Sequence, residues 1–176
     1  MNRILWFAFA LQAVCGLAAT NIPPALDRLN ASPYYRATVD ENGTLRAMVV
    51  LPLKRTETGL ETVAGVAWMK AEDGLEFFTL TLMLRGNSNQ SVPRLEPRLD
   101  LIGTNWTLKA TETYVSKSVL NFTTTVQGRI DRKGLNAIAA GEPISILFRT
   151  ATGQDSLRFT SDAGARLREL LRSVGP

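Results

Sequence analysis

The sequence predicts a mainly β protein: an antiparallel β-sandwich or barrel of about eight strands, with a short helix near residues 132–140 and an amphipathic C-terminal helix near 162–174. Three observations predict it. Segments with alternating apolar and polar side chains follow one another along most of the chain. Turn residues, including Asn-Gly and Asp-Gly pairs, stand between these segments. No strand–helix–strand alternation occurs among them, so we expect neighbouring strands to pair antiparallel.

Turn residues bound the candidate strands. These strands span residues 34–40, 44–55, 61–71, 75–85, 98–103, 106–117, 118–130, 143–150 and 156–160. A helical turn over 25–29 precedes them, after two prolines. Asn42-Gly43 and Asp73-Gly74 predict two hairpins. Pro52 indicates an edge position or a strand end, because proline cannot donate to the ladder.

Two features predict how the middle of the chain is arranged. Residues 75–85 are apolar on one face and only half polar on the other, which favours the centre of a sheet. Residues 106–117 and 118–130 alternate most clearly and are predicted as a half-buried antiparallel pair. Residues 86–97 are rich in turn formers, so we expect the longest loop there.

Two helices are predicted near the C-terminus. Asp131 is a candidate cap for a helix over 132–140, and Gly141 is its predicted stop. Ser161 and Asp162 are the candidate caps of the last helix. One stripe of that helix is apolar and is expected to pack against a sheet. The stripe comprises Ala163, Leu167, Leu170, Leu171 and Val174.

Residues 1–19 have the pattern of a signal peptide. Arg3 precedes an apolar run over 4–14, which is too short to span a bilayer, and small residues follow it. We therefore expect an exported chain (periplasmic, envelope or extracellular) whose residues 20–176 form a single β domain. An N-terminal core helix and a lipid anchor on Cys15 are the alternatives. The bulky Val14 beside that cysteine disfavours the anchor.

The composition excludes several kinds of catalytic and metal site. The chain has no histidine, and its one cysteine, Cys15, lies in the predicted leader. Ser-His-Asp and Cys-His nucleophilic sites and His-containing zinc sites are therefore excluded. No phosphate-binding glycine loop or calcium loop occurs, so we expect no cofactor and no metal, and an enzyme is disfavoured.

The charge pattern does not indicate a nucleic-acid partner. The sequence pI is 9.6, but acidic residues interleave with the arginines near the C-terminus, and no aromatic-basic strand motif occurs. Five Asn-x-Ser/Thr sites are open to glycosylation if the host is eukaryotic. They lie at Asn30, Asn42, Asn89, Asn105 and Asn121.

Trp106, Glu112 and Tyr114 are the candidate ligand-binding residues. A regular strand places all three on one face, so Glu112 is expected to point inward, where a carboxylate is costly unless paired or protonated. The alternative is that the strand bends and Glu112 emerges from the core. For Trp106 the alternative is plain core packing.

Three hypotheses for the function follow. The first is an exported, non-enzymatic β domain that binds or stabilises an envelope or extracellular component. The second is a carrier of a small apolar or lipid ligand inside a β-barrel. The third is a carboxylate-based hydrolase, which needs Glu112 in a cleft within about 10 Å of another acid.

Overall fold

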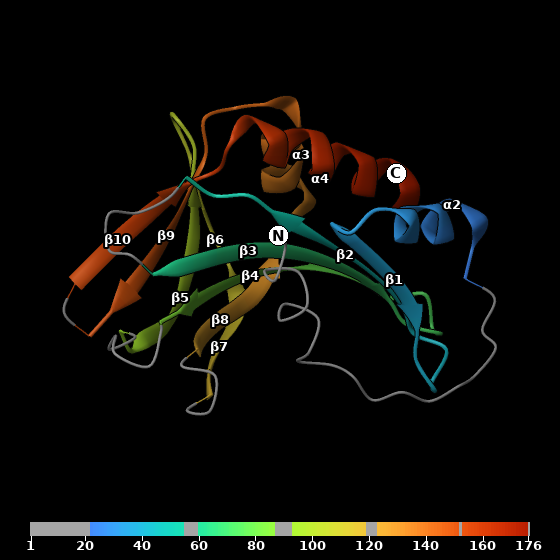
Figure 1. The fold of residues 1–176 in the computed structure, drawn as a ribbon, viewed down its shortest axis with the longest axis horizontal. Coiled ribbons are helices and arrows are strands. Elements are labelled where there is room, and N and C mark those ends of the chain that lie inside the picture. Colours follow the sequence, from blue (N-terminus) through green and yellow to red (C-terminus); the bar gives the residue numbers. More distant parts are fainter. Residues whose placement is uncertain (1–21, 55–59, 87–92, 119–122, 152, 176) are drawn as a thin grey trace.

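Two antiparallel sheets and three helical segments make up the computed structural model, which describes residues 22–54, 60–86, 93–118, 123–151 and 153–175 (Figure 1). The strands are β1 (Tyr35–Val39), β2 (Leu45–Leu51), β3 (Glu61–Lys70), β4 (Glu76–Arg85), β5 (Leu95–Ile102), β6 (Thr107–Lys109), β7 (Thr111–Ser118), β8 (Thr123–Ile130), β9 (Ser145–Thr150) and β10 (Gly153–Arg158). The helices are α2 (Pro24–Asp27), continued by a 3-10 turn η2 (Arg28–Ala31), α3 (Arg132–Ala140) and α4 (Ser161–Val174). The predicted leader, 1–19, lies outside the described residues.

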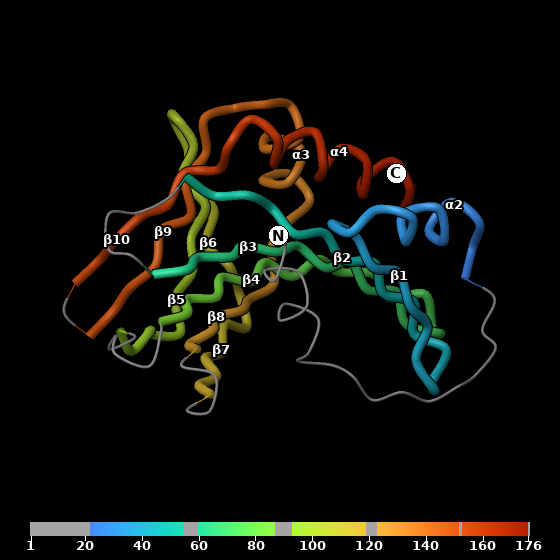
Figure 2. The backbone as a smooth tube through the Cα atoms, in the orientation of Figure 1, coloured from blue at the N-terminus to red at the C-terminus, as the bar shows by residue number. Residues whose placement is uncertain are grey.

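The topology confirms the antiparallel prediction and decides between a sandwich and a closed barrel. One sheet has six strands in the order β1-β2-β3-β4-β8-β7, and the other has four in the order β10-β9-β5-β6. Neither order returns to its first strand, so the arrangement is sandwich-like and the closed-barrel alternative is wrong. Figure 2 shows the β9–β10 hairpin at one end of the molecule and the β1–β2 hairpin at the other.

The predicted hairpins and the central strand are confirmed. Gly43 and Gly74 have positive φ angles of 72° and 85°, as tight turns between β1 and β2 and between β3 and β4 require. β2 ends at Leu51, directly before Pro52. β4 lies between β3 and β8, and even Met83 on its less apolar face is buried.

The core lies between the inner face of the six-stranded sheet, the four-stranded sheet and the helices. α4 packs along β2, with α3 beside it (Figure 1). The predicted apolar stripe of α4 is buried except at Val174, which is partly buried. The largest side chains under 2% exposed include Leu51, Leu80, Leu82, Leu99, Leu101, Leu135, Ile144, Ile146, Leu167 and Leu170.

The structure divides one of the predicted strands into two separate strands. Residues 106–117 divide into β6, which pairs with β5, and β7, which pairs with β8 in the other sheet. The chain passes from one sheet to the other next to Gly128, where a Cβ would lie 2.9 Å from the Ala110 Cβ and 2.6 Å from the Thr113 Cγ2. The pairing register of β7 with β8 then shifts between Thr111 and Tyr114. A bulge of this kind turns the following side chains to the opposite face.

Two other boundaries differ from the prediction. β5 begins at Leu95, inside the predicted loop, with a register shift before Leu99 that accommodates Pro97. The β9–β10 turn is shorter than predicted, because Gly153 already pairs with Thr150.

The helix ends are as predicted at α3 and differ at α4. Asp131 occupies the N-cap position of α3, and Gly141 follows its end with φ 90°. Thr160, not Ser161 or Asp162, occupies the N-cap position of α4. Neither N-cap side chain makes a capping hydrogen bond. In the part of the chain that the structure describes, no helix has the length and apolarity to cross a bilayer.

Candidate functional site

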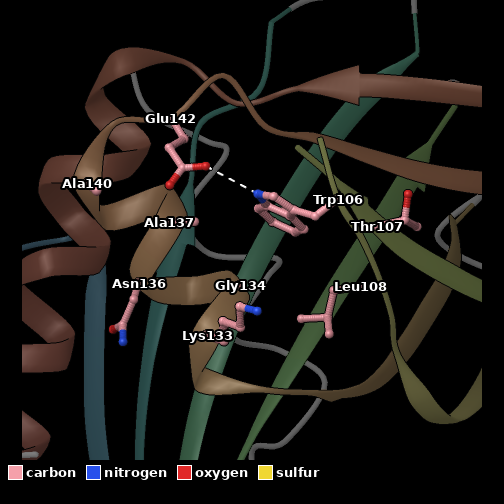
Figure 3. A pocket seen from close by; sticks show the side chains of 9 residues that line it. All are labelled: Trp106, Thr107, Leu108, Lys133, Gly134, Asn136, Ala137, Ala140 and Glu142. Carbon is pink, nitrogen blue, oxygen red and sulfur yellow. Dashed lines mark hydrogen bonds between the residues drawn. The ribbon is translucent and has the colours of Figure 1, made fainter. Parts of the chain in front are cut away.

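A groove of about 540 Å³ lies between β6 and α3 (Figure 3). Both its walls come from elements that the sequence places far apart, and the loop after α3 closes one end. Its lining consists of Trp106, Thr107, Leu108, Lys133, Gly134, Asn136, Ala137, Ala140 and Glu142. The groove falls in the range of small-molecule sites, about 300–1,000 Å³.

Gly134 brings the two walls together. A Cβ at this position of α3 would lie 2.7 Å from the Leu108 Cδ2 and 3.1 Å from the Leu101 Cδ1. Because glycine has no Cβ, the helix backbone approaches β6 and β5 directly. The floor of the groove is therefore a close contact between a helix and a strand.

Trp106 is held from two sides. Its indole lies against Gly103, where a Cβ would be only 2.3 Å from the ring carbon Cε2. The Gly103 N–H also donates to the Trp106 carbonyl, at 3.0 Å. On the other side the indole Nε1–H donates to the Glu142 Oε2, at 3.3 Å (Figure 3). These contacts set the orientation of the ring before any ligand arrives.

The polar groups of the groove balance one another. Lys133 and Asn136 on α3 and Glu142 after it are exposed, and they supply one positive charge, one amide and one negative charge. The amide both donates and accepts hydrogen bonds. Leu108, Ala137 and the indole provide the apolar part. The site suits a neutral ligand with an apolar face and many hydroxyl or amide groups.

Glu112 and Tyr114 lie elsewhere, on the other side of the β7 bend. Glu112 has φ 48°, its side chain is 62% exposed, and its Oε2 accepts from the Arg129 Nε at 2.9 Å. Tyr114 is 54% exposed and donates its hydroxyl to the Gln127 Oε1 at 2.7 Å. The inward placement predicted for Glu112 is wrong, and the bent-strand alternative is correct. Of the three candidates, only Trp106 lines the groove.

Asp100 is the buried carboxylate that sequence reasoning missed. Its side chain is 2% exposed, and its Oδ2 accepts from the Arg98 Nε at 3.0 Å. Asp100 lies between the inward Leu99 and Leu101, so its side chain belongs to the opposite face of β5. In a sheet with one face in solvent, that face is expected to be exposed. The signal for Asp100 in the sequence was Arg98, two residues away on the same face.

No metal centre is assembled in the described ranges: they contain no cluster of three or more His, Cys, Asp or Glu side chains suited to a metal ion. Comparisons with family models, with curated proteins and with solved structures found no match for this chain.

Proposed function

We propose that this chain is an exported, non-enzymatic binding domain that holds a neutral saccharide of an envelope or extracellular glycan in the groove at Trp106. The single observation that carries the proposal is the fixed indole, held between Gly103 and Glu142 on the wall of a groove whose charges cancel. Export is proposed from the apolar run over 4–14 and the small residues after it.

A saccharide matches both halves of this groove. A pyranose ring has an apolar C–H face and a rim of hydroxyls. An indole offers a broad apolar surface at little entropic cost, and a few placed polar groups then fix orientation. Asn136, Lys133 and Glu142 supply the donors and acceptors for that rim. A strongly ionic ligand would meet one charge of the wrong sign.

Binding is favoured over hydrolysis at this groove. Most glycosidases use two carboxyl groups, about 5–9.5 Å apart, on either side of the scissile bond. Of the nine lining residues, Glu142 is the one acid, and it is already bonded to Trp106. Glu112, on which the hydrolase hypothesis depended, lines no part of this groove.

The carrier hypothesis ranks second. Its closed barrel is not what the structure shows. The centre of the sandwich is filled by leucine, isoleucine and valine side chains with almost no exposed surface. A carrier of this type needs an apolar interior cavity.

Tryptophan fluorescence of the chain without residues 1–19 tests the proposal. A ligand in the groove contacts Trp106 and changes its emission. Trp68 is buried, so the change in emission is assigned to Trp106. Cellotetraose, maltotetraose and tetra-N-acetylchitotetraose are the probes. We expect saturable binding of at least one of them, weakened about tenfold or more by Lys133→Gln combined with Asn136→Ala. These exposed side chains can change without disturbing the core.

The matched control is Arg172→Gln, an exposed change on α4 outside the groove. It leaves the affinity for the tetrasaccharide unchanged. The proposal fails if none of the three probes alters the emission, or if the double variant and the control bind equally.

A further inference from the structure

A second groove, of about 490 Å³, opens where β5 faces β7 and β8 at one end of the sandwich. It is distinct from the Trp106 groove and shares no residue with it. Val115 pairs with Val126, and Lys117 pairs with Thr124, so the side chains of Val115, Lys117 and Thr124 belong to the core face of the six-stranded sheet. Its lining consists of Arg94, Leu95, Pro97, Val115, Lys117 and Thr124.

The walls of this groove are apolar and its floor is buried. Leu95 is 3% exposed, and Pro97 and Val115 extend the apolar surface toward the opening. Thr124 is 1% exposed, yet its hydroxyl makes no hydrogen bond in the part of the chain that the structure describes. A buried polar group without a partner is uncommon and costs stability.

The opening carries two positive charges. Arg94 and Lys117 are exposed, and neither forms an ion pair with a carboxylate of the described residues. None of the six lining residues is acidic. The groove therefore combines an apolar wall, a cationic rim and a buried hydroxyl that has no partner among the described residues.

We propose that this second groove binds a single-chain amphipathic carboxylate, such as a fatty acid. The acyl chain lies against Leu95, Pro97 and Val115, and the carboxylate accepts hydrogen bonds from Arg94 and Lys117. The Thr124 hydroxyl is a further donor, for which the described residues supply no partner. Charge complementarity favours an anion over a neutral lipid, and the apolar wall favours an acyl chain over a bare anion.

Decanoate is the probe, and backbone amide NMR shifts of the full domain are the readout. We expect saturable shifts at Val115 and Thr124, and an affinity reduced about tenfold or more in Arg94→Gln combined with Lys117→Gln. Lys109→Gln, an exposed lysine of β6 outside the groove, keeps the original affinity. Decanol binds at least about tenfold more weakly, because it lacks the charge.

Thr124→Val supplies an independent test. It replaces the unpartnered hydroxyl by a methyl of similar shape, so the domain keeps its stability while decanoate binds severalfold more weakly. The proposal is overturned by equal binding of decanol, by the same shifts with inorganic phosphate, by unchanged affinity in the rim variants, or by no shift with decanoate. None of these outcomes bears on the oligosaccharide test at Trp106.

Discussion

Arg132 and Arg168 each hold the C-terminal end of the other's helix. Arg168 of α4 donates from Nε and from a terminal nitrogen to the Ala139 carbonyl of α3, at 3.1 and 2.6 Å. Arg132, the first residue of α3, donates to the carbonyls of Leu171 and Gly175 at the end of α4. A helix end has unpaired carbonyls and a partial negative charge, so a guanidinium satisfies both. The two helices are thereby fixed side by side.

Removal of the Arg168 guanidinium is expected to destabilise the domain. Arg168→Met keeps much of the side chain but leaves the Ala139 carbonyl of α3 without this donor, and we expect a loss of about 1–2 kcal/mol in the free energy of unfolding. Urea denaturation measures it. Arg172→Met removes the same charge from an exposed position of α4, with no bond to α3, and costs less than about 0.5 kcal/mol. Equal losses in the two variants would rule out the capping role.

Gly164 sets the distance between α3 and α4. A Cβ there would lie 2.7 Å from the Ile138 carbonyl oxygen, which is backbone and cannot rotate away. In an isolated helix, Gly→Ala stabilises by about 1 kcal/mol. Here we expect Gly164→Ala to destabilise by about 1–3 kcal/mol, because the helices must separate. Thermal and urea unfolding decide the sign. A gain in stability would mean that the helices have room for a methyl group.

Tyr35 links β1 to α4 and makes stability sensitive to alkaline pH. Its hydroxyl donates to the Glu169 Oε2 at 2.6 Å. Burial, followed by this hydrogen bond and the Glu169 charge, raises the pKa of Tyr35 well above its ordinary value of 10.0. The folded state thus keeps a proton that the unfolded state loses as the pH passes about 10. The contribution is fully present below about pH 10 and is lost as the pH rises beyond it.

The variant Tyr35→Phe tests whether the Tyr35 hydroxyl causes this loss of stability at alkaline pH. It removes the titrating group and a hydrogen bond to a charged acceptor, so we expect about 1–3 kcal/mol lower stability at pH 7. Its free energy of unfolding then falls less steeply than that of the wild type between pH 9 and about pH 11. Urea melts at a series of pH values give both curves. Parallel curves would contradict the assignment.

Gly103 fixes the indole of Trp106, and the groove depends on it. Gly103→Ala places a methyl group where the ring now lies, so the ring must move and its bond to Glu142 is lost. We expect a red-shifted Trp106 emission, a loss of about 1–3 kcal/mol in stability and a loss of tetrasaccharide affinity. Glu142→Gln retains an acceptor for the indole and leaves the emission close to that of the wild type. An unshifted spectrum in Gly103→Ala would show that the ring is not held there.

The sequence predicted the elements that local chemistry decides. Asn42-Gly43 and Asp73-Gly74 mark their turns because only positive φ angles close them, and glycine adopts such angles at no steric cost. The bounds of α3 follow from Asp131 and Gly141, and the buried stripe of α4 follows from helical periodicity. Each of these signals lies within a few residues of the structure it determines.

The prediction that Trp106, Glu112 and Tyr114 share one strand face is wrong, because one bulge in β7 reverses the two faces of the strand. That bulge exists because the chain changes sheets beside Gly128, a residue outside the strand itself. Asp100 was missed because alternation with the inward Leu99 and Leu101 assigns it to the outer face of β5, yet the folded chain leaves it only 1% exposed.

By itself the sequence determined an antiparallel, strand-rich chain with two C-terminal helices, because alternation, turn residues and caps act through neighbouring residues. Only the tertiary structure decided that the sheets stay open, that residues 106–117 contribute strands to both of them, and that the Trp106 indole donates a hydrogen bond to Glu142 at the groove. These features depend on contacts between segments that are distant in the chain, and side-chain periodicity carries no information about which distant segment covers a given face.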